Sequence, residues 1–229
     1  MHVYQMLLPV VLVIMLVLGF IIDAYSVFLK VAVVDGLGES LAMANLVQYL
    51  ARISNVLVVF FLSFAFETGR LESDVVYLFM LASGLGVISV ITLLYVKRAC
   101  DLVTYSLFPV LYVPFPMLSR RLVWQDLKLF DAKQLRLVVT SAATNLLIVL
   151  AMFVPFGIAA IYPEMRMTSV YIGQLVNFLA TLLFFSLQEP VSMRLVDEEA
   201  YQSVGSALLW GRVSSYILAL VIFALLYRS

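Results

Sequence analysis

LVQYLARISNVLVVFFLSFAF, residues 46–66, is a nearly continuous apolar run that carries one arginine, Arg52. The run is long enough to cross a bilayer, which takes about 20 mostly apolar residues. A charge near the middle of a membrane span costs roughly 2.5–3.5 kcal/mol on insertion scales. In a soluble protein the same run would be a core helix, so the composition of the whole chain has to decide the fold.

The composition is that of a membrane protein. Hydrophobic residues make up 64% of the 229 residues and charged residues 12%, and the mean hydropathy is +1.09. Soluble domains carry about 25% charged residues, and a folded chain of this length still leaves about a quarter or more of its surface exposed. The formal net charge is zero, so no nucleic-acid partner is expected.

Cysteine and histidine are almost absent. Cys100 is the only cysteine and His2 the only histidine, so neither a disulfide framework nor a Cys/His metal site can be built. A catalytic Ser/His or Cys/His pair would have to use His2. The sequence therefore predicts no metal, no cofactor and no catalytic residue.

The predicted fold is all-α: a polytopic transmembrane helical bundle that forms a single domain over residues 1–229. Six segments have the length and hydropathy of membrane spans: about 5–29, 41–66, 75–96, 137–162, 169–187 and 206–227. Residues 104–124 contain three prolines and two arginines and are interpreted as an interfacial or re-entrant element rather than a seventh regular span. Pro190 is expected to end the fifth span.

The distribution of Lys and Arg predicts the orientation. One side of the predicted bundle receives nine of them: Lys30, Lys97, Arg98, Arg120, Arg121, Lys128, Lys133, Arg136 and Arg194. The other side receives three: Arg70, Arg166 and Arg228. Because cytoplasmic connections are enriched in these residues, both termini are predicted to lie outside the cytoplasm.

Two arginines lie within predicted spans, in the similar motifs Ala51-Arg52-Ile53-Ser54-Asn55 and Gly211-Arg212-Val213-Ser214-Ser215. Arg52 lies eleven residues into its span, at a depth of about 16 Å, which is about half the hydrocarbon thickness. A charge at that depth usually faces a cavity, an ion pair or a ligand. For Arg212 two interpretations stay open. It also faces a cavity, an ion pair or a ligand, or its long side chain reaches the membrane–water interface.

Asp23 is the predicted partner of Arg52, because the two residues lie at similar depth on adjacent antiparallel helices. The pair is either purely structural or lines a water-filled cavity in which an arginine meets an anionic ligand. Guanidinium suits phosphate because its planar fork binds two oxygens at once. Gln48 and Asn55, with Asn45, Gln174 and Asn177, add amide groups to such a cavity. Tyr25 is a candidate aromatic contact for a sugar, although tyrosines in spans are more often packing residues.

Several of these residues resemble a known family. The block from Ala24-Tyr25-Ser26-Val27 to Ala51-Arg52-Ile53-Ser54-Asn55, and Glu189-Pro190-Val191-Ser192-Met193 before Gly211-Arg212, is similar to the Amj family of bacterial alternate lipid II flippases. The resemblance extends over about residues 20–225 and is strongest in the first and last pairs of spans. In the family pattern a basic residue follows A-Y-S-V and an Asp-Pro stands where this chain has Glu189-Pro190. This chain departs from the pattern, because Phe28 follows A-Y-S-V directly and the basic residue, Lys30, comes two positions later.

The resemblance implies a lipid flippase of the bacterial cytoplasmic (inner) membrane, with lipid II, a polyprenyl-diphosphate-linked glycolipid of cell-wall biosynthesis, as its substrate. It implies a transporter rather than an enzyme, surrounded by membrane lipids. The predicted substrate-binding residues are Arg52, Arg212, Asp23, Asn55, Gln48, Tyr25 and Lys30. Two alternatives stay open: a membrane-embedded enzyme of polyprenyl-phosphate metabolism, and a non-catalytic membrane scaffold subunit.

Overall fold

The computed structural model describes residues 2–31, 37–67, 75–95, 103, 134–197 and 201–228. It does not describe the side chains of some residues within these helices, Lys30 and Arg52 among them. Residues 104–124, for which the sequence predicts an interfacial or re-entrant element, lie outside the described part of the chain. The described residues are helical apart from Tyr162 and contain no strand.

The helices are longer than the predicted spans but follow them closely. In chain order they are α1 (His2–Val31), α2 (Leu37–Glu67), α3 (Val75–Tyr95), α5 (Leu135–Ile161), the short 3-10 helix η3 (Pro163–Met165), α6 (Arg166–Leu183), the π-helix η4 (Phe184–Gln188), α7 (Glu189–Asp197) and α8 (Tyr201–Arg228). Within the described ranges, six helical stretches are long and apolar enough to cross a membrane. The predicted all-α, multi-pass membrane architecture is confirmed.

One predicted boundary is wrong, because the helix does not end at Pro190. The chain passes from α6 through η4 directly into α7, in which Pro190 is the second residue. The Glu189 N–H donates to the carbonyl of Phe184, five residues back, instead of four. This wider turn changes the hydrogen-bond register and places Pro190 in the first turn of α7, where a missing N–H is tolerated.

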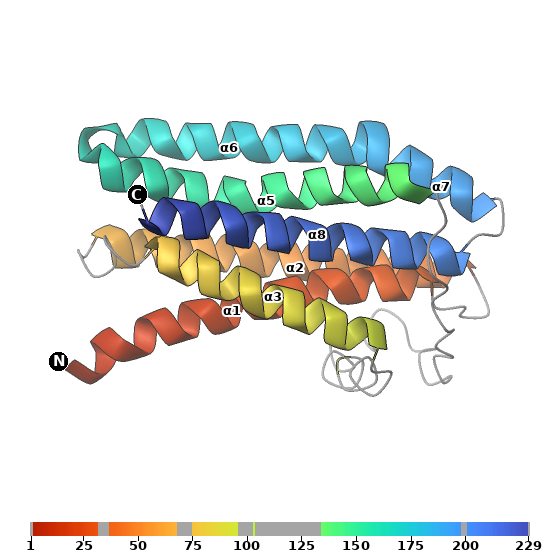
Figure 1. Cartoon of the computed structure of the whole chain (residues 1–229), viewed down its shortest axis with the longest axis horizontal. Coiled ribbons are helices and arrows are strands. Elements are labelled where there is room, and N and C mark those ends of the chain that lie inside the picture. The colour runs from red at the N-terminus through yellow and green to blue at the C-terminus, as the bar shows by residue number, and fades with distance from the viewer. Residues whose placement is uncertain are drawn as a thin grey trace.

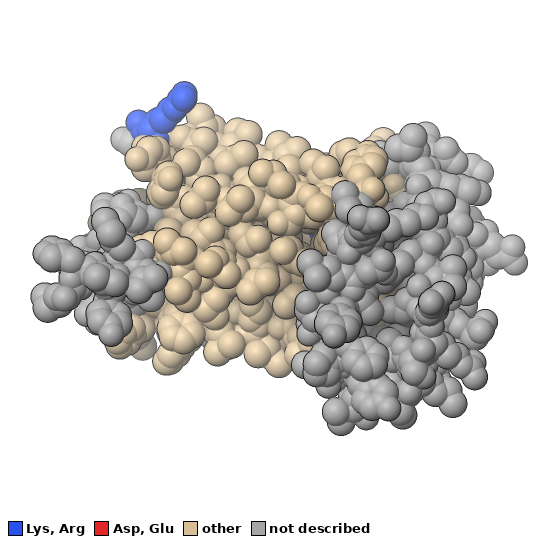
Figure 2. Space-filling view, turned by 90° about the horizontal axis from the view of Figure 1, so that it is seen from below, with Lys and Arg blue, Asp and Glu red and all other residues tan. Residues whose placement is uncertain are grey.

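Successive membrane-spanning helices run in opposite directions along one axis, whereas α1 and α3, which also pack together, run in the same direction (Figure 1). Both termini lie at one end of the bundle, whereas α3 ends and α5 begins at the other (Figure 1). Figure 2 shows that the described surface on one face is uncharged apart from one cationic side chain at its edge, as a hydrocarbon environment demands.

Helix α8 is the centre of the packing. It contacts α5, α3 and α1, while α2 packs mainly on α1 and α6 mainly on α5. The aromatic rings of Phe79, Phe153 and Phe223 bring α3, α5 and α8 together, with centroid separations of 4.8–5.7 Å. The helices therefore form a curved row that ends in α2 on one side and α6 on the other.

Small residues set how closely the members of this row approach. A Cβ added at Gly211 of α8 would lie 2.5 Å from Ser141 Cβ and 2.8 Å from the Val138 carbonyl oxygen of α5. The Ser141 hydroxyl donates to the Leu208 carbonyl across the same contact, at 3.1 Å. Gly173 of α6 lies equally close to Pro155 of α5. Such close backbone contacts are typical of helix packing in membranes.

Candidate functional site

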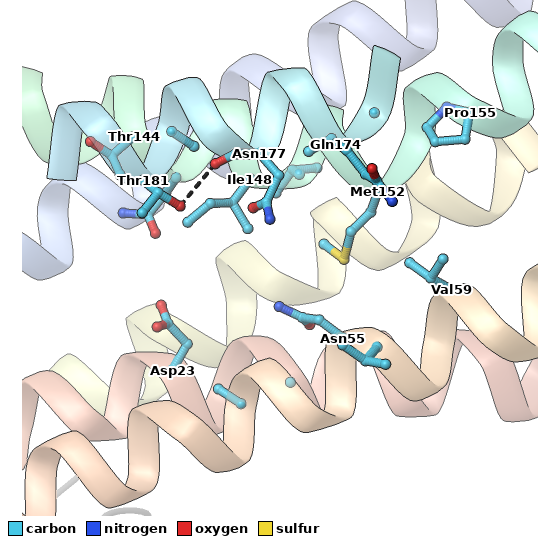
Figure 3. A pocket seen from close by; sticks show the side chains of 18 of the residues that line it. Asp23, Asn55, Val59, Thr144, Ile148, Met152, Pro155, Gln174, Asn177 and Thr181 are labelled. Carbon is cyan, nitrogen blue, oxygen red and sulfur yellow. Dashed lines mark hydrogen bonds between the residues drawn. The ribbon is translucent and has the colours of Figure 1, made fainter. Parts of the chain in front are cut away.

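A cavity of about 580 Å³ lies between the two ends of the helix row. Helices α1 and α2 form one wall, α5 and α6 the opposite wall, and α8 contributes Arg212 and Tyr216. Figure 3 shows Asp23, Asn55 and Val59 on the first wall, across from residues of α5 and α6. The volume lies within the range of small-molecule sites, about 300–1,000 Å³.

The lining residues follow helical periodicity. On α2 they are Gln48, Ala51, Asn55, Val56, Val59 and Ser63. Apart from the adjacent pair Asn55 and Val56, they are spaced three or four residues apart and therefore share one face. On α6 and η4 a similar stripe runs from Arg166 to Gln188, 22 residues or about 33 Å along the helix axis. The stripes on α2 (48–63) and α5 (144–159) cover 15 residues each, about 22 Å, so the cavity extends over most of the roughly 30 Å of the hydrocarbon core.

An ion pair lies at one end of the cavity. The Arg212 Nε–H donates to Asp23 Oδ2 at 2.6 Å, and joins α8 to α1. The Arg212 side chain is 4% exposed and that of Asp23 is 22% exposed. Gly211 turns toward α5, as its contacts with Ser141 and Val138 show, so the next residue, about 100° further round α8, is free to turn toward α1 and the cavity.

The structure thus gives Asp23 a partner other than the predicted one. The predicted Asp23–Arg52 contact stays a prediction, because the side chain of Arg52 lies outside the described residues. For Arg212, one of the two open interpretations is wrong: its buried guanidinium does not reach out to the interface. A charge taken out of water in this way needs a partner, and Asp23 supplies one.

Polar atoms in this cavity lack partners. Four buried side-chain atoms of its lining have no hydrogen-bond partner among the described residues: Arg212 Nη1, Asn55 Oδ1, Thr144 Oγ1 and Gln188 Oε1. Only one other such atom, Ser83 Oγ, occurs in the described part of the chain, and Ser83 does not line the cavity. A buried polar group without a partner costs about 1–3 kcal/mol, so their concentration here indicates a place for a polar ligand or water.

The lining stripe of α6 continues through the π-helix η4 to Gln188. Gln188 is the last residue of η4, is 3% exposed and lines the cavity. An inserted π-turn rotates the residues that follow it relative to a regular helix, and such turns occur frequently at functional sites. Gln188 therefore joins the stripe that α6 begins.

The lining is more polar near the ion pair than in its other half, where Ser63 and Gln174 lie among apolar residues. The half near the ion pair contains Asp23, Gln48, Thr144, Asn145 and Gln188, whereas Val59, Met152, Pro155, Phe156 and Ala159 line the other half. Arg166 and Ser169 lie at the far end of the apolar half. The cavity is therefore amphipathic along the direction of the membrane normal.

The predicted site residues have different outcomes. Asp23, Gln48, Asn55 and Arg212 line the cavity together with Gln174 and Asn177. Tyr25 is fully buried and is not part of the lining, so its ring packs within the bundle. The side chains of Arg52 and Lys30 lie outside the described residues. Arg52 is four residues after Gln48 and three before Asn55, so its backbone position falls in the same stripe of α2.

Sequence reasoning missed Thr144, Asn145, Gln188 and Tyr216. Asn145 could have been predicted, because a polar side chain within a long apolar run is a signal of the same kind as Arg52. Its Nδ2 donates to the Ser141 carbonyl at 2.8 Å. No local signal marks Tyr216, which is 2% exposed and stacks on Phe20 with a centroid separation of 4.5 Å.

Within the described ranges, no three His, Cys, Asp or Glu side chains are grouped so that they could hold a metal ion. Comparison with protein-family models, with curated proteins and with solved structures finds no match for this chain.

Proposed function

We propose that the protein is a flippase, which moves an anionic, polyprenyl-diphosphate-linked lipid of the lipid II type across the bacterial cytoplasmic membrane. The observation that carries this proposal is the amphipathic cavity. It extends over most of the hydrocarbon core, and its more polar half holds a buried arginine with an unpartnered Nη1.

The ion pair suits a ligand that comes and goes. Asp23 neutralises Arg212 through Nε, while Nη1 still has hydrogens to donate. A phosphate oxygen at Nη1 would form a charge-assisted hydrogen bond, which is about twice as strong as a neutral one. The amides of Gln48, Asn55 and Gln188 then supply donors and acceptors for the groups beyond the phosphate.

The length of the cavity favours transport. Arg212 lies eleven residues into α8, about 16 Å along its axis, and Arg166 is the first residue of α6, so an anionic head would meet one cation at mid-depth and another at the far end of the cavity. The apolar stretch between them has room for the part of the lipid that needs no polar contact. An enzyme acting on the same lipid would need reactive groups at one depth only.

Complementation of a bacterial strain tests this function. When the resident lipid II flippase is depleted, expression of the wild-type chain should sustain growth, and expression of Arg212→Gln at an equal membrane level should not. Lysis despite full expression of the wild-type protein would contradict the proposal. Release of phosphate or diphosphate from a polyprenyl substrate by the purified protein would favour the enzyme alternative instead.

A further inference from the structure

The wall of the cavity is incomplete between α2 and α6. Val56 of α2 and Val170, Gln174 and Asn177 of α6 line the cavity and have exposed side chains. Val56 is 68% exposed and Val170 is 47% exposed. These four residues, called the α2–α6 seam below, therefore mark where the cavity opens sideways.

The helix packing accounts for the opening. Helix α2 packs mainly on α1, and α6 packs mainly on α5, so α2 and α6 are the two free ends of the helix row. In the close view Asn55 and Val59 lie across an open gap from Asn177 and Gln174 (Figure 3), and the same residues line the cavity.

The surroundings of the α2–α6 seam are apolar. Phe60 of α2 is 64% exposed and Phe178 of α6 is 61% exposed. Both belong to helices that are long and apolar enough to span a membrane. A side opening between them faces the hydrocarbon of the bilayer rather than water, so what passes through it has to be apolar.

We propose that the α2–α6 seam is the passage for the hydrocarbon tail of the lipid whose anionic head meets Arg212. The two ends of the cavity identify the lipid as its occupant. At one end lies a buried cation with an unpartnered Nη1. At the other end the more apolar half of the cavity opens onto lipid. The tail stays in the bilayer while the head enters. This inference rests on the proposed function, because it assumes an anionic lipid as the ligand.

Narrowing the opening tests the inference. Val56→Trp and Val170→Trp place a large side chain at the α2–α6 seam, and Ile88→Trp places one on α3, where Ile88 is 61% exposed and remote from the lining. Binding of undecaprenyl diphosphate and of short-chain geranyl diphosphate to the purified proteins is then compared. The seam variants should bind the long lipid about tenfold more weakly, because losing contact with about two buried methylene groups has that effect. They should bind geranyl diphosphate as the wild type does, and Ile88→Trp should bind both lipids normally.

Each other outcome has a defined meaning. Wild-type binding of undecaprenyl diphosphate by both seam variants would overturn the inference and leave the proposed function intact. Equal loss of both ligands by seam variants that melt like the wild type would also overturn it, since the seam would then act on the head. A wild-type protein that binds neither lipid would overturn the proposed function and this inference with it.

A second measurement does not depend on a bulky substitution. A benzophenone amino acid in place of Val170 should crosslink to labelled undecaprenyl diphosphate, and unlabelled lipid should compete this crosslink away. The same group in place of Ile88 should give only weak crosslinking that unlabelled lipid does not reduce. Equal, non-competed crosslinking at both positions would contradict the passage.

Discussion

The Asp23–Arg212 ion pair joins α1 to α8, and its two residues are 189 positions apart in the chain. Each partner's carbonyl accepts a hydrogen bond from a serine three residues later, Ser26 at 2.6 Å and Ser215 at 2.7 Å. The pair thus combines a structural contact with a site for an anion, and substitutions can separate the two roles.

Arg212→Gln should lower the free energy of unfolding by about 2–3 kcal/mol, less than the roughly 3–5 kcal/mol of a fully buried pair because Asp23 is partly exposed to the cavity. Asp23→Asn in the same chain should restore much of this stability, because no unpaired charge is left. Lipid binding should not return, since the cation is gone. Thermal melting in detergent and binding of undecaprenyl diphosphate measure the two effects. A double variant that both folds and binds like the wild type would show that the pair is structural only.

Two unpartnered buried hydroxyls form a matched test, one inside the cavity and one outside. Thr144→Val and Ser83→Ala each delete such a hydroxyl, and each should leave the free energy of unfolding unchanged or raise it by about 1 kcal/mol. Only Thr144→Val should weaken lipid binding, because only Thr144 lines the cavity. Equal affinities in isothermal titration of both variants would contradict a ligand at Thr144.

At the scale of helices, close packing of α5 on α6 should be sensitive to a single methyl group. A Cβ added at Gly173 would overlap Pro155, whereas one added at Gly84 would lie 4.0 Å from Leu220 Cδ1, an ordinary contact. Gly173→Ala should therefore lower the melting temperature, with a loss of about 1–3 kcal/mol. Gly84→Ala should raise it slightly, because alanine restricts the unfolded chain and favours a helix by about 1 kcal/mol. A neutral Gly173→Ala variant would show that the two helices can separate without loss.

The six spans could be predicted from the sequence because hydropathy over about 20 residues is a property of each segment alone. The π-turn before Glu189 could not, since hydropathy carries no information about hydrogen-bond register. The partner of Asp23 could not be predicted either. Similar depth and adjacency in the chain favoured Arg52. Arg212 is brought to Asp23 by the central position of α8, which depends on how all the helices pack. Gln48 and Asn55 were predictable as polar residues on an apolar helix.

At the scale of the whole molecule, the charge distribution predicts that segment 97–136 lies in the cytoplasm. Cys100 lies outside the described residues, so its predicted position in the cytoplasm rests on the sequence alone. In intact spheroplasts Cys100 should resist a membrane-impermeant maleimide and should react after permeabilisation. Labelling from outside would reverse the predicted orientation and would place the ion-pair end of the cavity toward the exterior.

The central claim is that lipid crosses the membrane by way of the cavity at Arg212, and translocation in proteoliposomes tests it most directly. Purified protein is reconstituted with a fluorescent polyprenyl-diphosphate glycolipid, and the fraction that reaches the outer leaflet is followed by an added quencher. The wild type and Ile88→Trp should move the lipid at similar rates, well above protein-free vesicles. The Asp23→Asn/Arg212→Gln variant should fall to the protein-free rate although it is folded. Wild-type translocation by this folded double variant would contradict the account.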